Sequence, residues 1–337
     1  MSDTHAPSGA GRRARRVAVT GAAGFIGSHL VERHLAQGDT VVGCDDLSTG
    51  SRANLAAVAA NPRFTFIEGD VRTSEALAAA IAQSDLVYHL AGVVGVFRVL
   101  AEPLHTLDVN IAGTWRVLAA AADAATPPRV VVASTSEVYG PSTAARLSED
   151  DFALFRADPA GRWGYTVSKL ANEAQALAWW RERQVPVTVA RLFNTVGLRQ
   201  SPRYGMVLPR FVRQAAAGEA LTIFGDGLQT RAFCDVRDTV QALQLLAVRD
   251  AALGEIVNVG SDREITIREL AALVCRVAGA TVPPRFVSYE DAYGQPYEDI
   301  PRRCPDLAKL ERITGFRPDR PLEDTVRGLL AAIEVTA

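Results

Sequence analysis

A glycine-rich turn between an apolar run and a helical pattern constrains this chain more than any other feature. The run Arg16–Thr20 leads directly into Gly21, Gly24 and Gly27, and an amphipathic stretch follows to residue 37. Gly21 permits a tight turn, Gly24 lets the backbone approach a diphosphate, and Gly27 lets the helix pack closely on the strand. The first amide groups of that helix then favour an anion. The pattern predicts a strand–turn–helix unit that binds a dinucleotide.

The chain up to residue 193 repeats this alternation of apolar runs and helical patterns. Runs at 40–45, 64–70, 85–92, 129–135 and 185–193 predict strands, and the stretches 105–123 and 164–184 predict helices. Such alternation is typical of an α/β fold with a Rossmann-type, doubly wound parallel sheet. After Asn194, glycine, proline and turn residues become frequent. That change predicts a smaller C-terminal α/β substrate lobe over the carboxyl ends of the strands.

These patterns divide the chain into three parts. Residues 1–16 have no apolar periodicity and predict a disordered tail. Residues 17–193, with parts of 236–260, are expected to form the dinucleotide-binding domain. Residues 194–235 and 261–337 are expected to form the substrate-binding lobe.

Composition excludes several classes of protein. No apolar run approaches ~18 residues, so we expect no membrane span. A formal net charge of -2 gives no basic field for nucleic acid. The cysteines at 44, 234, 275 and 304 form no C-x-x-C pair, which argues against structural zinc and a disulfide framework. We therefore expect no metal, no nucleic-acid partner and a reducing, cytoplasmic location.

Several residues at the expected sheet edge are candidates to contact the dinucleotide. The second strand ends at Asp45, where a carboxylate would bind the adenosine ribose hydroxyls and repel a 2′-phosphate, which favours NAD over NADP. Asp70 follows the third strand and is expected either near the adenine or as a turn cap. The expected cofactor contacts are Gly21, Gly24, Phe25, Ile26, Gly27, Asp45, Asp70, Val71, Leu90, Ala91, Gly92, Tyr165 and Lys169.

Tyr165 and Lys169 lie one helical turn apart in the sequence YTVSK. A free tyrosine has a pKa of about 10, too high for a base at neutral pH. A neighbouring ammonium and the positive nicotinamide would stabilise the phenolate and lower that pKa. Upstream, the strand expected to face this helix ends at Thr135, Ser136 and Glu137. We expect Thr135 or Ser136 to hydrogen-bond the hydroxyl that is oxidised.

Taken together, the motifs resemble the extended short-chain dehydrogenase/reductase family of nucleotide-sugar enzymes, from about Val17 to the C-terminus. They are TGAAGFIGSHL, CDDLSTG, GDV, HLAG, NIAGT, ASTSEVYG, YTVSK, RLFNTVG, LTIFGDGLQTRAFCDVRD and PRRCPDLAKL. The resemblance implies bound NAD and a catalytic triad of Thr135, Tyr165 and Lys169. It also implies a homodimer built on two helices per subunit, here about 105–123 and 164–184.

The block around Arg303 is similar to UDP-glucuronate decarboxylases, which make UDP-xylose or UDP-4-keto-pentose. The resemblance implies that Tyr165 takes the C4 hydroxyl proton of the sugar while C4 passes hydride to NAD. The C6 carboxylate beside the new ketone would then leave as carbon dioxide. Glu137 and Arg303 would be the specialised residues, because arginine binds a carboxylate through two hydrogen bonds. The expected substrate contacts are Asn194 and Arg231 at the diphosphate, Thr222 and Phe224 beside the base, and Tyr297 and Arg303 at the sugar.

Three other functions stay open at this point. A 4-epimerase acting on UDP-glucose or UDP-glucuronate would return hydride to the other face of the ketone, and such enzymes usually lack a glutamate where Glu137 stands. A 4,6-dehydratase would use Glu137 as the C5 base, but glucose-type dehydratases carry an aspartate where Ser136 stands. An NAD-binding redox sensor would turn over no sugar, and the intact Tyr165 and Lys169 argue against it.

Overall fold

The computed structural model describes residues 13–142, 144–152, 163–201, 206–293, 300 and 302–334. Within these ranges, seven parallel strands form the main sheet: β1 (Arg16–Thr20), β2 (Thr40–Asp45), β3 (Phe64–Glu68), β4 (Leu86–His89), β5 (Arg129–Thr135), β6 (Val187–Leu192) and β11 (Ile256–Val259). Their order is β11-β6-β5-β4-β1-β2-β3. The direction of winding reverses between β1 and β4, and in such sheets ligands bind at the carboxyl ends beside that point. The predicted Rossmann-type sheet is confirmed.

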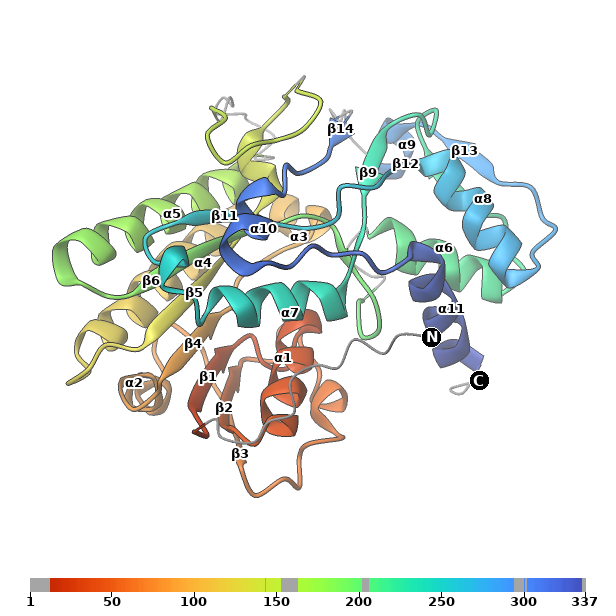
Figure 1. Cartoon of the computed structure of the whole chain (residues 1–337). Coiled ribbons are helices and arrows are strands. Elements are labelled where there is room, and N and C mark those ends of the chain that lie inside the picture. The colour runs from red at the N-terminus through yellow and green to blue at the C-terminus, as the bar shows by residue number, and fades with distance from the viewer. Residues whose placement is uncertain are drawn as a thin grey trace.

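Helices cover both faces of the main sheet (Figure 1). One face carries α2 (Glu75–Ala82), α4 (Pro103–Ala122) and α5 (Gly164–Arg183), and the other carries α1 (Phe25–Ala36), α7 (Val236–Leu246) and α10 (Ala308–Thr314). The side chains of successive β5 residues point to opposite faces of the sheet. Val131 packs on the α7 side, whereas Val130 and Val132 pack on the α4 side.

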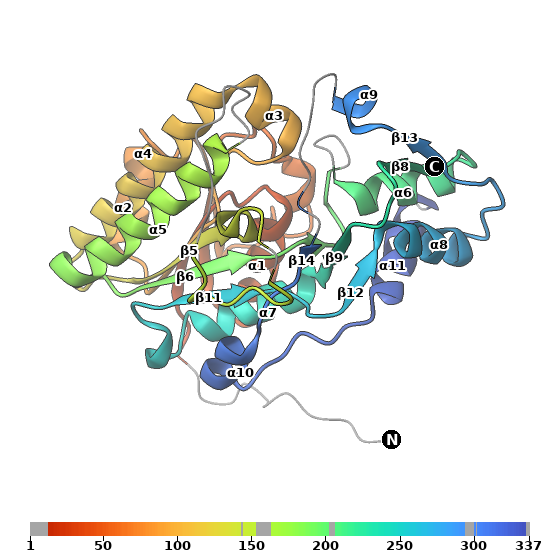
Figure 2. The ribbon, with the colours of Figure 1, turned by 90° about the horizontal axis from the view of Figure 1, so that it is seen from above.

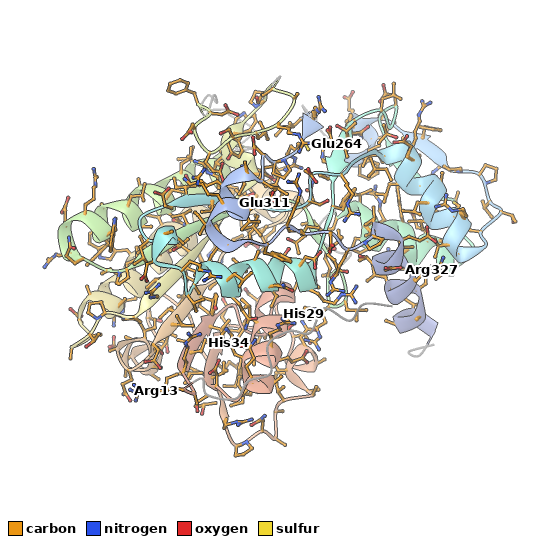
Figure 3. All side chains as sticks on the ribbon, viewed as in Figure 1. Arg13, His29, His34, Glu264, Glu311 and Arg327 are labelled. Carbon is orange, nitrogen blue, oxygen red and sulfur yellow. The ribbon has the colours of Figure 1, made fainter. Side chains whose placement is uncertain are left out.

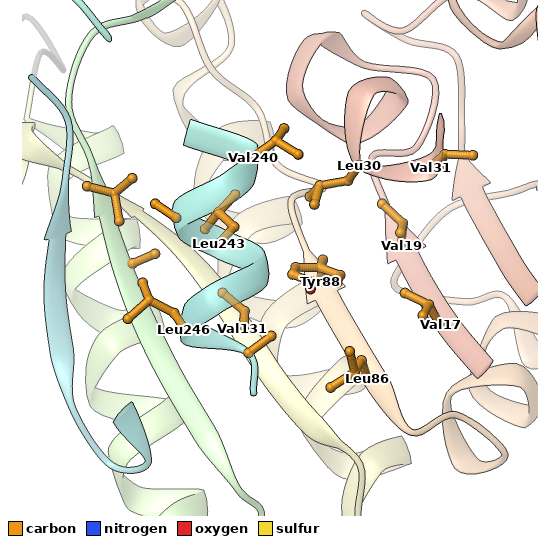
Figure 4. Close-up of a cluster of buried hydrophobic side chains, with 14 of the residues drawn as sticks. Val17, Val19, Leu30, Val31, Leu86, Tyr88, Val131, Val240, Leu243 and Leu246 are labelled. Carbon is orange, nitrogen blue, oxygen red and sulfur yellow. The ribbon is translucent and has the colours of Figure 1, made fainter. Parts of the chain in front are cut away.

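The core on the α1 and α7 side is drawn in Figure 4. Val17 and Val19 of β1 meet Leu30 of α1, and Leu243 of α7 packs over the middle of the sheet. Each of these side chains is buried, and full burial of such a side chain contributes about 1.5–3 kcal/mol. This packing holds α1, and therefore the turn that precedes it, in a fixed place on β1.

A second, smaller lobe lies beside the carboxyl ends of the strands (Figures 1 and 2). Its helices are α6 (Val207–Ala216), α8 (Ile267–Ala278), α9 (Tyr289–Tyr293) and α11 (Leu322–Glu334). Its small sheets pair β7 (Thr195–Val196) with β10 (Cys234–Asp235), β8 (Thr222–Phe224) with β13 (Arg285–Val287), and β9 (Thr230–Ala232) with both β12 (Glu264–Thr266) and β14 (Arg302–Arg303). β9 and β14 lie between the main sheet and the lobe's helices.

Local signals explain where several elements begin and end. α8 starts with a capping box, in which Thr266 and Glu269 bond each other's backbone N–H groups, and it ends before Gly279 in the left-handed conformation. α4 starts at Pro103, earlier than the predicted residue 105, because proline suits the first helical position. The short helix α3 (Val96–Ala101) precedes it.

The predicted tail is too long at its C-terminal end. Residues 1–12 lie outside the described residues, but Arg15 N–H donates to Asp39 at 2.8 Å and Arg16 opens β1. Arg16 N–H also donates to Asp85 at 2.7 Å, so both backbone positions belong to the fold. Within the described ranges, no helix combines the length and the apolar composition that crossing a membrane requires.

Candidate active site

A cavity of about 490 Å³ lies at the carboxyl ends of the main strands and is lined by residues of both lobes. The predicted site residues that line it are Gly21, Gly24, Phe25, Ile26, Gly27, Asp45, Asp70, Val71, Leu90, Ala91, Gly92, Thr135, Ser136, Glu137, Tyr165, Lys169, Asn194, Phe224, Arg231 and Arg303. Among the described residues, Thr222 is the one expected contact outside this lining. Tyr297 lies outside the described residues.

The glycine turn leaves no room for side chains. Gly21 has a φ of +69°, and a Cβ there would stand 2.9 Å from the Ala91 nitrogen. A Cβ on Gly27 would stand only 2.0 Å from the Gly21 carbonyl oxygen. Gly24 caps α1 without a side-chain hydrogen bond, and the first turn of α1 has no acidic residue. The turn therefore fits a dinucleotide diphosphate, which the first N–H groups of α1 would bind.

Asp45 ends β2 at this cavity and is mostly buried. Its carboxylate accepts hydrogen bonds from Ala23 N–H at 3.0 Å and from Leu47 N–H at 2.8 Å. Burial raises the pKa of Asp45, and these backbone donors oppose that rise. Gly50 must be a glycine here, because a Cβ would stand 2.7 Å from the Asp45 carboxylate. The residue expected to bind ribose thus also fixes the turn that follows β1.

Asp70 combines the two alternatives that the sequence leaves open. Its carboxylate accepts from Arg72 N–H at 2.8 Å, so it caps a turn, and it also lines the cavity. The Arg72 guanidinium bonds the same carboxylate and also pairs with Asp108. The hydrogen bond from Arg72 lowers the pKa of Asp70.

Lys169 is held against the strand that carries Thr135. Its side chain is on α5, is buried, and donates from Nζ to the Ala133 carbonyl at 3.0 Å. Burial lowers the pKa of Lys169 to about 8, with Glu173 opposing that change. The contact fixes α5 against β5 at the level where the cofactor is expected.

In the protein alone, the pKa of Tyr165 lies above its ordinary value. Burial and the neighbouring Glu137 carboxylate raise the pKa of Tyr165, whereas a hydrogen bond with Thr135 and the charge of Arg303 lower it. The expected lowering by Lys169 is absent among these causes, and the lysine's ammonium is bonded to the Ala133 carbonyl instead. In the protein alone, desolvation outweighs the nearby positive charge.

Glu137 and Arg303 meet although they are far apart in the sequence. Glu137 is on a short 3₁₀ helix that directly follows β5, η2 (Ser136–Tyr139), and Arg303 is on β14. Arg303 Nη1 stands 3.4 Å from Glu137 Oε1, and Arg303 Nε is buried without a hydrogen-bond partner in the described part of the chain. In the β14–β9 register Arg303 lies opposite Arg231. Two arginines therefore line the same part of the cavity, an arrangement that suits an anionic ligand.

Thr222 does not line the cavity. Its N–H and its hydroxyl are bonded to the Gln214 amide at 3.0 and 2.9 Å, and its carbonyl accepts from Arg210. Arg210 does line the cavity, and its guanidinium lies 3.8 Å above the Phe224 ring. A strand as short as β8 gives too little alternation to predict which residues face a cavity.

Sequence reasoning gave no role to Asn110, the first residue of the NIAGT motif and a fully buried residue of α4. Its Oδ1 accepts from Val93 N–H at 2.8 Å, and its Nδ2 donates to Ser168 at 2.9 Å. It thus joins the loop after β4 to the helix that carries Tyr165. An asparagine in the middle of a helix is a detectable signal, because such a residue needs a specific partner.

Comparison with known proteins identifies the family once this geometry is known. A model of the NAD dependent epimerase/dehydratase family matches residues 17–260. The chain belongs to this family. The matched range holds the glycine turn, the Thr135, Tyr165 and Lys169 constellation and the whole main sheet.

Relatives within the family extend the match over nearly the whole chain. The chain is 34% identical over 318 residues to a UDP-N-acetyl-alpha-D-glucosaminuronate decarboxylase of Bacillus cytotoxicus, covering 93% of this chain and 97% of that one. It is 33% identical to UDP-glucuronic acid decarboxylase 1 of Danio rerio, covering 92% and 70%. The structure of a Bacillus cereus UDP-glucuronic acid 4-epimerase with UDP-glucuronic acid and NAD matches with a TM-score of 0.84 and 26% identity, covering 96% and 100%.

As a member of this family, the protein is an NAD-dependent enzyme that modifies nucleotide sugars, and the NAD prediction is confirmed. The family resemblance predicted from the motifs is confirmed as well. Across the described ranges, no group of three or more histidine, cysteine, aspartate or glutamate side chains is placed to hold a metal ion.

Proposed function

We propose that this enzyme is a UDP-glucuronic acid decarboxylase that yields UDP-4-keto-pentose, UDP-xylose or both. The observation that carries the proposal is the Glu137–Arg303 pair beside Tyr165 in the cavity. Arginine suits a substrate with a carboxylate at C6, and Arg303 Nε, which has no hydrogen-bond partner among the described residues, is a donor for it. The names of the relatives described above support the same reaction class.

The first step is oxidation at C4. NAD, when bound along the glycine turn and Asp45, supplies the hydride acceptor. Tyr165 takes the C4 hydroxyl proton, Thr135 orients that hydroxyl, and Lys169, bonded to the Ala133 carbonyl, holds α5 and therefore Tyr165 against β5. In the protein alone, burial and Glu137 raise the pKa of Tyr165. The positive charge of the oxidised cofactor, when bound, would lower this pKa and so favour the phenolate, the form that accepts the proton.

The second step is loss of carbon dioxide. With a ketone at C4, the C5–C6 bond breaks and its electron pair moves toward the C4 oxygen, which the protonated Tyr165 stabilises. Arg303 holds the carboxylate in place until it leaves. Carbon C5 then takes the proton that Tyr165 removed from the C4 hydroxyl, while the Glu137 carboxylate stays paired with Arg303.

A second candidate is the same reaction on a substrate with an acetamido group at C2. It is favoured by one specific observation, the 34% identity to the Bacillus cytotoxicus relative over 97% of that protein. The 4-epimerase alternative has support from the Bacillus cereus structure, whose bound sugar is also a glucuronic acid. All three possibilities share the C4 oxidation. The two decarboxylases lose C6 and differ in the group at C2 of the substrate, whereas the epimerase keeps C6.

Proton NMR of the protein with NAD and one nucleotide sugar per tube tests the proposal. The tubes contain UDP-glucuronic acid, its 2-acetamido analogue, UDP-glucose or GDP-mannose. We expect a pentose or a 4-keto-pentose to appear in the first tube. A C4 epimer in that tube, or reaction only with UDP-glucose or GDP-mannose, would overturn the decarboxylase assignment. NAD binding without turnover in any tube would favour a redox sensor.

Neighbouring arginines provide a matched pair of variants. Arg303→Ala should lower kcat/KM for UDP-glucuronic acid by about 100-fold, because it removes a charged hydrogen bond to the carboxylate. Arg302→Ala should keep near-normal turnover, since Arg302 does not line the cavity and its Nε donates at 2.7 Å to Oε1 of Glu264, which is labelled in Figure 3. Equal losses in the two variants would remove Arg303 from the proposed role.

We further propose a homodimer formed through α4 and α5. Leu104 and Trp115 of α4 are 81% and 56% exposed, and Val167 of α5 is exposed as well. Trp115 packs edge-to-face on Trp179 of α5 with ring centroids 5.2 Å apart. Large exposed apolar side chains on two adjacent helices support an interface with a second copy.

We also propose a reducing, cytoplasmic location. Cys44, Cys234, Cys275 and Cys304 are all free thiols. Burial raises the pKa of the Cys44 and Cys234 thiols to about 12, so both stay protonated and unreactive. Fractionation of cells that express the full chain would test this placement.

A further inference from the structure

Asn258 of β11 is completely buried, with 0% of its surface exposed, and both ends of its side-chain amide are bonded. Its Oδ1 accepts a hydrogen bond from the Tyr139 hydroxyl at 2.7 Å. Its Nδ2 donates to the Leu147 carbonyl at 2.8 Å and to the Asp306 carbonyl at 3.2 Å. One amide therefore joins three segments that are distant in the sequence.

Two of these segments carry the Glu137–Arg303 pair. Tyr139 is on η2 with Glu137, and Asp306 follows β14, which carries Arg303. Leu147 strengthens the second connection, because its N–H donates to the Cys304 carbonyl at 2.8 Å and its carbonyl accepts from Asp306 N–H at 2.9 Å. Asn258 thus holds the backbone on both sides of the carboxylate–guanidinium contact.

The Tyr139 end of this connection is rigid. The Tyr139 ring lies 4.7 Å from the Arg191 guanidinium, which bonds both oxygens of Glu173 at 3.0 and 2.8 Å. Asn258 N–H donates to Glu149 at 2.8 Å, which fixes β11 to the segment around Leu147. A buried network whose members are all satisfied allows little movement.

We infer that Asn258 and Tyr139 are positioning residues, which set the separation of Glu137 and Arg303 through the Tyr139–Asn258–Asp306 hydrogen bonds. This inference rests on the proposed function and names the residues that hold its specialised pair in place. The Glu137–Arg303 contact is long, at 3.4 Å, so the two side chains depend on their backbones for alignment. A misplacement of about 1 Å in such a site can reduce a rate by about 100-fold.

Tyr139→Phe is the first test, because it removes one hydroxyl and keeps the ring on Arg191. Its matched control is Thr188→Val on β6, which also removes a buried hydroxyl that donates to a carbonyl, that of Ala252 at 2.8 Å, away from the cavity. The two variants should lose similar amounts of thermal stability. Tyr139→Phe should lower kcat for carbon dioxide release from UDP-glucuronic acid by about tenfold or more, whereas Thr188→Val should stay within twofold of the parent.

A binding measurement separates this inference from the proposed function. Calorimetric titration of the NAD-loaded protein gives the ratio of Kd for UDP-glucose to Kd for UDP-glucuronic acid. The parent should prefer the carboxylate sugar, and Tyr139→Phe should reduce that preference about fivefold while its affinity for UDP-glucose is unchanged. If the parent has no preference, the proposed function and this inference both fail. If the parent has the preference and Tyr139→Phe retains it, only the positioning role is wrong.

A double-variant cycle gives a second, independent readout. In an Arg303→Ala background, Tyr139→Phe should cause little additional loss of kcat, because the group it positions is already gone. Independent, additive losses would show that Tyr139 has only a structural role. Asn258→Asp should cause the same losses of kcat and of carboxylate preference as Tyr139→Phe, but larger ones. It replaces the Nδ2 donor with an oxygen that faces the Leu147 and Asp306 carbonyls. Where Asn258→Asp does not fold, the Tyr139→Phe results decide.

Discussion

Lys169 shows how burial changes a single residue. The residue is 6% exposed and its ammonium bonds a backbone carbonyl, and its pKa falls from about 10.5 in an unfolded chain to about 8. Between those two values the unfolded chain binds a proton that the folded protein does not. The stability of the parent protein therefore rises as the pH increases from about 8 to about 10.5.

Lys169→Met should remove this pH dependence. At pH 7 the parent carries the full cost of a desolvated charge, about 3 kcal/mol from the size of the pKa shift, and the variant does not. The variant's gain is reduced by the hydrogen bond lost at the Ala133 carbonyl. The measurement is denaturant unfolding of the NAD-free proteins at pH 7 and pH 10. The variant's free energy of unfolding, relative to that of the parent, should be lower at pH 10 than at pH 7 by about 3 kcal/mol. A difference that stays constant over this range would contradict the assigned cause.

Sequence patterns predicted which side chains at the ends of long strands line the cavity. They did not predict properties that depend on burial and on contacts with distant residues. Thr135 and Asp45 end predicted strands of the main sheet and line the cavity as expected. The prediction for the pKa of Tyr165 concerns the protein with NAD bound; in the protein alone burial and Glu137 raise this pKa, which the spacing of Tyr165 and Lys169 does not reveal. Thr222 does not line the cavity, and its N–H and hydroxyl are bonded to Gln214, a contact that no local pattern predicts.

At the scale of elements, the β1–turn–α1 unit tolerates the least change. Gly27→Ala would place a methyl group 2.0 Å from the Gly21 carbonyl oxygen, so α1 must move away from β1. We expect a large fall in melting temperature and loss of NAD binding, measured by thermal unfolding and by titration with NAD. Gly328→Ala is the control, since nothing lies within 4 Å of its Cβ in α11, and it should raise stability by about 1 kcal/mol. Normal NAD affinity in Gly27→Ala would contradict this account of the turn.

The strands of the main sheet were predicted except for β11, whereas the short strands of the smaller lobe were not. The helices predicted at 105–123 and 164–184 match α4 and α5 within two residues at each end. β14 has only two residues, and it exists because β9, about 70 positions earlier, provides its hydrogen bonds. Periodicity needs several residues to be visible, so strands of this length depend on tertiary pairing that a sequence window does not contain.

For the whole molecule, the α4–α5 surface determines the expected assembly. Trp115→Glu would put a charge in the centre of the proposed interface and should convert a dimer into a monomer, because a buried unpaired charge costs several kcal/mol. Sedimentation velocity of both proteins at equal concentration is the measurement. Phe152→Glu, at a 90% exposed side chain outside α4 and α5, should leave the sedimentation coefficient unchanged. A parent protein that sediments as a monomer would exclude this interface.

The two hydrogen bonds of Asp45 have a consequence for engineering the enzyme toward a phosphorylated cofactor. Exchange of this carboxylate for a small neutral residue is the obvious way to admit a 2′-phosphate. Here the same exchange would also remove the acceptor for two backbone N–H groups. One is that of Ala23 in the glycine turn, and the other is that of Leu47 in the loop after β2. A successful redesign must therefore replace an acceptor for two backbone amides at the same time as it removes a charge. Cofactor preference and the folding of the first loop are, in this chain, properties of one side chain.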